Sequence, residues 1–212
     1  MKPKLIIFDC DGVLVDTEAI STRVLAEQAR ELGIEISNQE ALEVFAGTNL
    51  HFVVDFLGKR LGKKLPDDFQ SNYRQRSLEE YKKGLLPIPN IHEVVRHLNI
   101  PFCVASNAPI YKIEFNLKLT ELFSFFEGKM FSAYEVKAWK PDPTLFLTAA
   151  KTMGFSPQDC LVVEDSPSGV RAAVTAKMNV LGYATEKKKA TLLQSHGATV
   201  ISDMREVLKF EI

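Results

Sequence analysis

Short runs of apolar residues recur along the chain, and most are separated by stretches with helical periodicity. Uninterrupted apolar runs are typical of strands covered on both faces, whereas apolar residues spaced three and four apart indicate helices. The runs are Leu5–Phe8, Phe102–Ala105, Lys129–Phe131, Leu161–Val163, Val180–Tyr183 and Thr199–Ile201. The helical patterns are Ile91–Leu98, Ile110–Leu119, Thr144–Met153, Gly169–Lys177 and Ala190–His196. This alternation predicts an α/β fold with a parallel sheet covered by helices.

The connection between the first and second strands does not follow this alternation. Residues 17–83 contain only helical patterns, at Glu18–Leu32, Gln39–Phe45, Leu50–Leu61 and Pro66–Lys82. A connection of this length with helices of its own is better interpreted as a separate unit than as a loop. We therefore expect an α/β core of residues 1–16 and 84–212, and a small all-helical domain of residues 17–83. Gly84–Pro89 is expected to be a hinge or return segment.

Composition and charge narrow the class of protein. The 212 residues suffice for a hydrophobic core, and the formal net charge of −1 argues against general nucleic-acid binding. No apolar run approaches the ~20 residues of a membrane span, and the first strand leaves no room for a signal peptide. Cys10, Cys103 and Cys160 lack metal-ligand spacing, so we expect free thiols in a cytoplasmic protein. We also expect a monomer without membrane partners, and interpret Lys187–Lys189 as a solvated helix face.

Asp9 directly follows the first apolar run, and a second aspartate, Asp11, comes after one intervening residue. Side chains alternate along an extended chain, so the two carboxyl groups can point to the same side. Such a pair is costly at the end of a buried strand unless a cation lies between the carboxylates, and oxygen ligands suit Mg²⁺. A plain turn is the alternative, because Asp-Gly after an apolar run is a common turn signal. A calcium EF-hand loop would need an oxygen ligand near Val13 and a glutamate near Ile20, and neither is present.

Polar residues also follow the next three strands. Ligands bind beyond the carboxyl ends of the strands in open α/β sheets, so these residues are candidates for one common site. They are Ser106 and Asn107 after the second run, Lys140 after the third, and Glu164 and Asp165 after the fourth. Each has a structural alternative, such as helix capping for Ser106 and an exposed position for Lys140. Their occurrence at consecutive strand ends favours a single site.

The set of side chains suits phosphoryl transfer, in which a metal, a lysine and hydrogen-bond donors offset charge on the phosphoryl oxygens. Asp9 is the candidate nucleophile, and Asp11 is the candidate acid and base. Lys140 would balance charge between the phosphate and Asp9, while Ser106 and Asn107 would donate hydrogen bonds to the phosphoryl group. The candidate metal-site residues are Asp9, Asp11, Glu164 and Asp165, with Glu164 either a ligand or a partner of the ligands.

The motifs Asp9–Asp16, Ser106–Asn107, Lys140–Pro143 and Glu164–Gly169 resemble, in this order, the four motifs of the haloacid dehalogenase superfamily. The helical insert after the first motif is similar to that of the subgroup containing β-phosphoglucomutase and many sugar-phosphate phosphatases. The resemblance covers essentially the whole chain. It implies a Rossmann-like core with a small helical cap, an aspartate nucleophile, an aspartate acid/base and one Mg²⁺. It also implies that the Asp11 position gives the metal its backbone carbonyl.

The resemblance also sets expectations for the reaction. Haloacid dehalogenases need neither magnesium nor an acid at the Asp11 position, so the chain resembles the phosphoryl-transfer enzymes of the superfamily. We expect a magnesium-dependent phosphatase of a small phosphorylated metabolite, either a sugar or a polyol phosphate. The alternatives are a β-phosphoglucomutase-like phosphomutase and a non-catalytic binding protein on the same fold. The mutase carries a lysine, an arginine and a histidine where this chain has Ala46, Leu50 and Ser21, which favours hydrolysis.

The loop after the second helix of the insert falls where the family has its specificity loop. Gly47 would let this loop approach the site. The polar side chains of Thr48, Asn49 and His51 would then contact a polyol. Helix capping is an equally good explanation of these polar residues.

Overall fold

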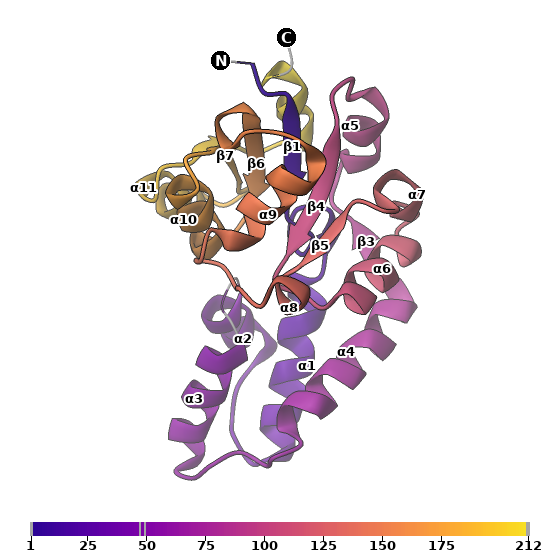
Figure 1. The fold of residues 1–212 in the computed structure, drawn as a ribbon. Helices are drawn as coiled ribbons and strands as arrows, with labels where there is room; N and C mark the ends of the chain where they lie inside the picture. Colours follow the sequence, from indigo (N-terminus) through magenta and orange to yellow (C-terminus); the bar gives the residue numbers. More distant parts are fainter. Residues whose placement is uncertain (1, 47, 49, 211–212) are drawn as a thin grey trace. The chain divides into compact units, whose positions relative to one another are not determined.

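The chain forms two compact units, one of Met1–Asp16 and Leu86–Ile212 and the other of Thr17–Leu85. The structure is a computed structural model that describes residues 2–46, 48 and 50–210 (Figure 1). Each unit has its own buried apolar residues. The assignment of these units as a catalytic core and a cap stays a prediction.

A six-stranded parallel sheet forms the centre of the first unit. Its strands are β1 (Leu5–Phe8), β4 (Phe102–Ser106), β5 (Met130–Ser132), β6 (Cys160–Glu164), β7 (Asn179–Tyr183) and β8 (Thr199–Ile201). Their order across the sheet is β5-β4-β1-β6-β7-β8, and all neighbours are parallel. The predicted α/β fold is therefore confirmed. Because the strands are parallel, the carboxyl ends of β5, β4, β1 and β6 lie along the same edge of the sheet.

Helices cover the sheet of the first unit. They are α5 (Ile91–His97), α6 (Ile110–Leu119), α7 (Phe123–Phe126), α8 (Ala133–Val136), α9 (Thr144–Met153), α10 (Pro167–Thr175) and α11 (Lys187–Ser195). Two 3₁₀ segments, η1 (Pro157–Asp159) and η2 (Met204–Phe210), complete the unit. Ile7 of β1 shares a buried apolar cluster with Phe146 of α9 and Val170 of α10. The next residue, Phe8, points to the opposite face and contacts Phe126 of α7, with ring centroids 6.1 Å apart.

A short two-stranded ribbon joins the two chain segments of the first unit. β2 (Val15–Asp16) pairs antiparallel with β3 (Leu86–Pro87). The backbone N–H of Ile88 also donates to the carbonyl of Leu14, at 3.0 Å. The segment where the chain leaves this unit is therefore hydrogen-bonded to the segment where it returns.

The second unit is helical. Its helices are α1 (Glu18–Glu31), α2 (Asn38–Phe45), α3 (Leu50–Leu61) and α4 (Phe69–Gly84). Ser37 caps α2 by accepting a hydrogen bond from the backbone N–H of Glu40, at 3.0 Å. Leu25, Phe45 and Leu57 belong to the apolar cluster that packs these helices together. α4 begins later than the predicted Pro66, because residues 66–68 form a turn in which the Phe69 N–H bonds the Pro66 carbonyl.

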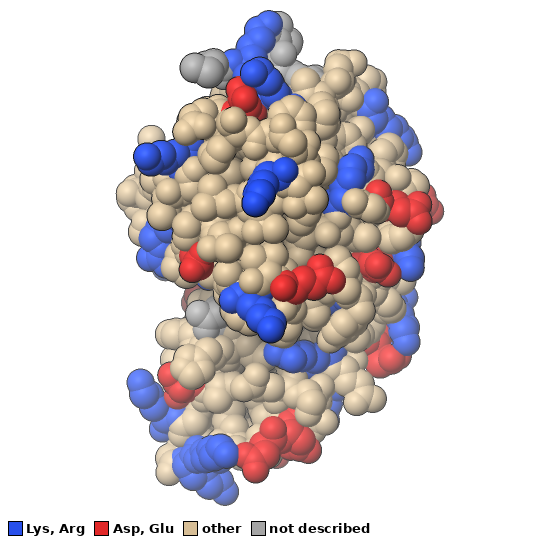
Figure 2. Space-filling model, viewed as in Figure 1, with Lys and Arg blue, Asp and Glu red and all other residues tan. Residues whose placement is uncertain are grey.

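The surface carries charges of both signs. On the face drawn in Figure 2, basic and acidic side chains are interspersed. Cys10, Cys103 and Cys160 are free thiols, as predicted, and all three are buried. Among the described residues, no helix combines the length and the apolar character needed to cross a membrane.

Candidate active site

Asp9 lies at the carboxyl end of β1, where the sheet places it beside the ends of the neighbouring strands. Its backbone N–H donates to the Val163 carbonyl of β6, at 2.9 Å. This hydrogen bond continues the β1–β6 ladder by one residue and fixes the backbone of Asp9. The side chain is almost wholly buried. The central strands of the sheet therefore hold the backbone of the candidate nucleophile in place.

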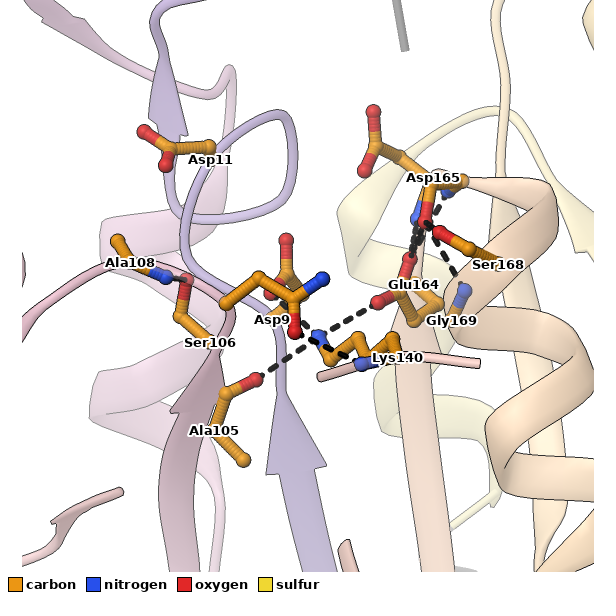
Figure 3. Close-up of polar contacts among 12 residues, drawn as sticks. Asp9, Asp11, Ala105, Ser106, Ala108, Lys140, Glu164, Asp165, Ser168 and Gly169 are labelled. Carbon is orange, nitrogen blue, oxygen red and sulfur yellow. Dashed lines mark hydrogen bonds and ion pairs between the residues drawn. The ribbon is translucent and has the colours of Figure 1, made fainter. Parts of the chain in front are cut away.

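Lys140 connects three strand ends through its ammonium group (Figure 3). Its Nζ donates to Asp9 Oδ1 at 2.6 Å, to Glu164 Oε1 at 2.7 Å and to the Ala105 carbonyl at 2.9 Å. All three N–H bonds of the ammonium group thus have an acceptor. The side chain is only 2% exposed. A buried lysine with this set of acceptors is not a surface residue, so the structure brings Lys140 together with Asp9 and Glu164.

Glu164 is completely buried and accepts hydrogen bonds on both carboxylate oxygens. Besides the Lys140 contact to Oε1, its Oε2 accepts from the N–H groups of Asp165 and Ser166 and from Ser166 Oγ, each at 2.9 Å. The start of α10 has room for this carboxylate because residue 169 is glycine. A Cβ at Gly169 would lie 1.8 Å from Glu164 Oε1. These contacts suit Glu164 to hold Lys140 and the loop of Asp165 in place.

Asp165 lies against the loop that carries Asp9 and Asp11. A Cβ on Gly12, whose φ is +80°, would lie 2.2 Å from Asp165 Oδ2. Glycine is therefore required at position 12 for its backbone conformation and for the close approach of Asp165. One ligand oxygen each from Asp9, Glu164 and Asp165 can be chosen so that all lie within 4.8 Å of one another.

Asp11 lies two residues beyond Asp9 and is partly exposed. Its Oδ2 accepts from Lys112 Nζ at 2.8 Å, and its Oδ1 accepts from Asn116 Nδ2 at 3.3 Å. Its loop is fixed by the Gly12 N–H, which donates to the Val15 carbonyl at 2.8 Å. The carboxyl group of Asp11 is thus held by α6, separately from the group around Lys140.

Ser106 and Asn107 lie at the end of β4, on the same edge of the sheet. Ser106 Oγ is buried and accepts from the Ala108 N–H at 3.2 Å. Asn107 Oδ1 accepts from the backbone N–H of Lys140 at 2.9 Å. Both side chains therefore organise the loops that carry the site. Their predicted contacts with a phosphoryl group stay a prediction.

The predicted specificity loop belongs to the second unit. Gly47 and Asn49 lie outside the described residues. Thr48 is exposed, and its Oγ1 donates to the Phe45 carbonyl at 2.8 Å, which is a capping interaction at the end of α2. His51 is exposed, with Nε2 3.7 Å from a carboxylate oxygen of Asp55. A substrate contact by Thr48 or His51 stays a prediction.

Burial and nearby charges shift the pKa values of Asp9 and Lys140. Burial raises the pKa of Asp9 above its usual range, and the nearby carboxylates of Glu164 and Asp165 raise it further, against the opposing effect of Lys140. Burial also disfavours the charged form of Lys140, but Asp9 and Glu164 outweigh it and hold the pKa of Lys140 above its ordinary value. A positive charge beside Asp9 would therefore favour its ionised, nucleophilic form.

The donor set fits a divalent cation. The carboxylates of Asp9, Glu164 and Asp165 lie close together, and Lys140 and Lys189 form ion pairs with them. Carboxylates this close disfavour one another's ionised form, and a cation among them would offset that effect. The clustered ligand atoms are all oxygens, which hard cations such as Mg²⁺ prefer. The arrangement can hold such a cation next to the Asp9 carboxylate.

Three polar contacts of the site were not predicted from the sequence, namely those of Lys112, Asn116 and Lys189. The interpretation of Lys187–Lys189 as a solvated face is wrong for Lys189, whose Nζ lies 2.8 Å from Asp165 Oδ2. For Lys112 and Asn116 a signal existed, because they are four residues apart on a predicted helix that begins directly after the Ser106–Asn107 strand end.

Comparisons with known proteins identify the family of the chain. Residues 3–177 match a family model described as a haloacid dehalogenase-like hydrolase. The 6-phosphogluconate phosphatase of Escherichia coli K12 is 30% identical over 182 residues, which are 85% of this chain and 82% of that protein. Hexitol phosphatase B of the same organism is 30% identical over 179 residues, covering 81% and 79% of the two chains. A haloacid dehalogenase-like protein of unknown function from Agrobacterium tumefaciens C58 superposes with a TM-score of 0.88, at 31% identity, covering 98% and 96% of the two chains.

Proposed function

We propose that this chain, which belongs to the haloacid dehalogenase-like hydrolase family, is a magnesium-dependent phosphatase of a sugar or polyol phosphate. Membership of this family and similarity to named phosphatases make the chain a phosphoric monoester hydrolase. The observation that carries the proposal is the ammonium group of Lys140 between Asp9 and Glu164, with Asp165 alongside. This arrangement supports a nucleophilic carboxylate in a site that neutralises negative charge.

The proposed reaction proceeds in two steps. A carboxylate oxygen of Asp9 forms a bond to phosphorus, the bond from phosphorus to the alcohol oxygen breaks, and Asp11 donates the proton that this oxygen needs. In the second step the oxygen of water bonds to the phosphorus, the bond from phosphorus to the Asp9 oxygen breaks, and Asp11 takes a proton from the water, so that inorganic phosphate is released. Asp9 and Asp11 return to their starting states. Lys140 offsets charge on Asp9 and the phosphoryl group throughout.

The chain's own residues supply the metal site in this proposal. Asp9 and Asp165 would hold Mg²⁺ with their carboxylates and Asp11 would contribute its backbone carbonyl, while Glu164 would position its neighbours. When bound, the ion supplies positive charge that stabilises phosphoryl oxygens. Ser106 and Asn107 would donate hydrogen bonds to the same oxygens.

The substrate class is inferred from the relatives. Two of them are named as phosphatases of 6-phosphogluconate and of hexitol phosphates, which are phosphorylated sugar acids and polyols. The test is a screen of phosphorylated metabolites with purified protein and Mg²⁺, in which released phosphate is measured. We expect the highest kcat/KM for sugar and polyol phosphates. A preference for nucleotides or phosphoproteins would contradict this class, and no hydrolysis of any ester would contradict the proposed function.

Hydrolysis is proposed rather than mutase chemistry. A mutase must hold the phosphate group that is not reacting, which calls for a cationic anchor. The helical unit has Ala46 and Leu50 beside the loop, and the Ser21 hydroxyl shares a hydrogen bond with the Tyr81 hydroxyl, at 2.5 Å. The discriminating assay offers β-glucose 1-phosphate with catalytic glucose 1,6-bisphosphate. Glucose 6-phosphate forming much faster than free phosphate would establish a mutase instead.

The cellular setting stays a prediction. We propose a monomer in the cytoplasm that acts on a small molecule, without nucleic-acid or membrane partners. The three buried free thiols support a reducing compartment. Size-exclusion chromatography with light scattering tests the oligomeric state.

A further inference from the structure

Helix α6 contacts Asp11 through two polar side chains that have no role in the reaction proposed above. Lys112 and Asn116 lie four residues apart on α6, so their side chains project from the same face of the helix, one turn apart. Both reach Asp11, more than a hundred residues earlier in the chain. The helix therefore presents a pair of donors to one carboxyl group.

Lys112 and Asn116 donate to different oxygens of the Asp11 carboxylate. Lys112 Nζ lies 2.8 Å from Oδ2 of Asp11, and Asn116 Nδ2 lies 3.3 Å from Oδ1. Each oxygen has its own donor, so rotation of the carboxyl group would break at least one hydrogen bond. Because a carboxylate oxygen has two lone pairs, one hydrogen bond to it does not by itself exclude a proton on the same oxygen. In Figure 3 the carboxylate of Asp11 points away from Asp165.

Asn116 is unusual for a residue in the middle of a helix. Its side chain is completely buried, and its Oδ1 has no hydrogen-bond partner among the described residues. A buried amide with an unmet acceptor is unfavourable for stability, and an apolar side chain would avoid this cost. A leucine at position 116 could not donate a hydrogen bond to Asp11, whereas the Nδ2 of Asn116 does.

We propose that Lys112 and Asn116 are positioning residues that hold the Asp11 carboxyl group for proton transfer. This inference rests on the proposed function, because it needs Asp11 to be the acid and base. Lys112 fixes one oxygen through a charge-assisted hydrogen bond, and Asn116 fixes the other from the buried side of α6. Asp11 is 29% exposed, and these two hydrogen bonds restrict the direction of its side chain.

Leaving-group dependence provides the test. Expulsion of p-nitrophenolate needs no proton, whereas expulsion of a sugar or polyol oxygen needs one from Asp11. The first turnover is measured by rapid quench for p-nitrophenyl phosphate and for the alkyl phosphate hydrolysed fastest in the metabolite screen. The variants are Lys112→Met, Asn116→Leu and Lys112→Arg. Lys118→Met is the matched control, because Lys118 lies on the same helix and pairs with Glu114 instead.

For Lys112→Met we expect the first-turnover rate with the alkyl phosphate to fall roughly 10²-fold, the lower end of general acid catalysis, with KM nearly unchanged. The rate with p-nitrophenyl phosphate should fall less than about threefold on the same grounds. Asn116→Leu should show the same selectivity with a smaller loss, Lys112→Arg should recover most of the rate, and Lys118→Met should match wild type. Equal losses for both substrates, or no loss for the alkyl phosphate, would overturn the positioning role.

Asp11→Asn, measured in parallel, separates this inference from the proposed function. If Asp11→Asn hydrolyses both substrates at the wild-type ratio of rates, the role of Asp11 itself is wrong. If Asp11→Asn loses the alkyl phosphate selectively and Lys112→Met does not, only the positioning role is wrong. If the loss in Lys112→Met follows a second anionic group on the substrate, Lys112 binds that group and does not position Asp11.

Discussion

Ion pairs occur in both units of the chain, but their surroundings differ. In the first unit the Lys140 side chain is 2% exposed and contacts Asp9 and Glu164, which are also buried. In the helical unit Arg23 pairs with Glu80 and Arg76 with Glu31; Glu80 is partly buried, and the other three side chains are exposed. Exposed pairs contribute little to stability, because water and salt screen them. Buried charges are costly to desolvate and depend on every partner being present.

The difference in burial distinguishes the surface ion pairs of the helical unit from the cluster around Lys140, which we assign to the chemistry of the site. A buried group of carboxylates around one lysine is a poor way to stabilise a fold, since apolar residues of similar size often do as well or better. The buried cluster around Lys140 lies at the carboxyl edge of the parallel sheet, and its oxygens fit a cation, which indicates a functional site rather than a stabilising one. The exposed pairs of the helical unit have no such arrangement of clustered ligand oxygens among the described residues.

Replacing the nucleophile should produce the largest effect. Asp9→Asn should lower kcat on the order of 10⁴-fold or more, since an amide cannot form the aspartyl-phosphate. The fold should persist, because the Asn side-chain oxygen can still accept from Lys140. Phosphate release and circular dichroism check the two statements. Asp67→Asn, which alters an exposed pair with Lys64, is the control and should keep full activity. A tenth of the wild-type rate in Asp9→Asn would show that Asp9 is not the nucleophile.

Removal of the metal should abolish activity almost as completely. Excess chelator followed by dialysis leaves Asp9, Glu164 and Asp165 without the cation that their charges require. Mg²⁺ should restore the rate, and Ca²⁺ should do so poorly because its coordination is looser. Mg²⁺ should also stabilise the folded state, by about 2.7 kcal/mol at a hundred times its Kd.

Asp165→Asn is the matched variant for the metal experiment. It should lose most of the stabilisation by Mg²⁺ measured in urea unfolding, while Asp67→Asn should retain it. Full activity of the dialysed wild-type protein in excess chelator would rule out a metal-dependent mechanism.

Loss of the buried lysine should destabilise the first unit strongly. Lys140→Met leaves Asp9 and Glu164 buried without their shared cation, which should lower the free energy of unfolding by about 3–5 kcal/mol. Arg23→Met removes the cation of an exposed pair and should leave the urea midpoint nearly unchanged. Similar shifts for the two variants would mean that the burial of the Lys140 cluster has no energetic consequence.

The pH dependence of stability is the smallest expected effect and the sharpest probe of Asp9. Because burial raises the folded-state pKa of Asp9 above its ordinary 3.8, the folded state binds the proton more tightly than the unfolded state does. In excess chelator, Asp9 should therefore lower the free energy of unfolding as the pH rises above about 4. Urea unfolding from pH 4 to 8 of wild type and Asp9→Asn isolates this contribution.

The wild-type curve should decline relative to Asp9→Asn as the pH rises, and Mg²⁺ should remove the decline by favouring the carboxylate. A difference between the two proteins that does not vary with pH would contradict the raised pKa of Asp9. Lys140 does not interfere in this range, because its folded-state pKa lies above 10.5 and its stabilising contribution is lost only as the pH rises past that range.

Local sequence determined the elements and the edge at which the chemistry lies. The apolar runs became the six strands to within one residue at either end, because a strand buried on both faces needs a continuous apolar segment. Parallel pairing then places the residues after each run at one edge, so Asp9, Lys140 and Glu164 could be assigned to one site from order alone. The four helices of the insert followed from periodicity in the same way.

Tertiary packing decided which side chains meet at that edge. Lys112, Asn116 and Lys189 lie on helices, and the residue that a helical side chain contacts depends on how its helix packs on the sheet. Periodicity predicts the face of a helix but not its angle or depth. The spacing of Lys112 and Asn116 therefore places them on one face near the site without identifying Asp11 as their partner, and no pattern identifies the partner of Lys189. The close approach of Asp165 to Gly12 has the same origin, because only the packed sheet and loops bring them together.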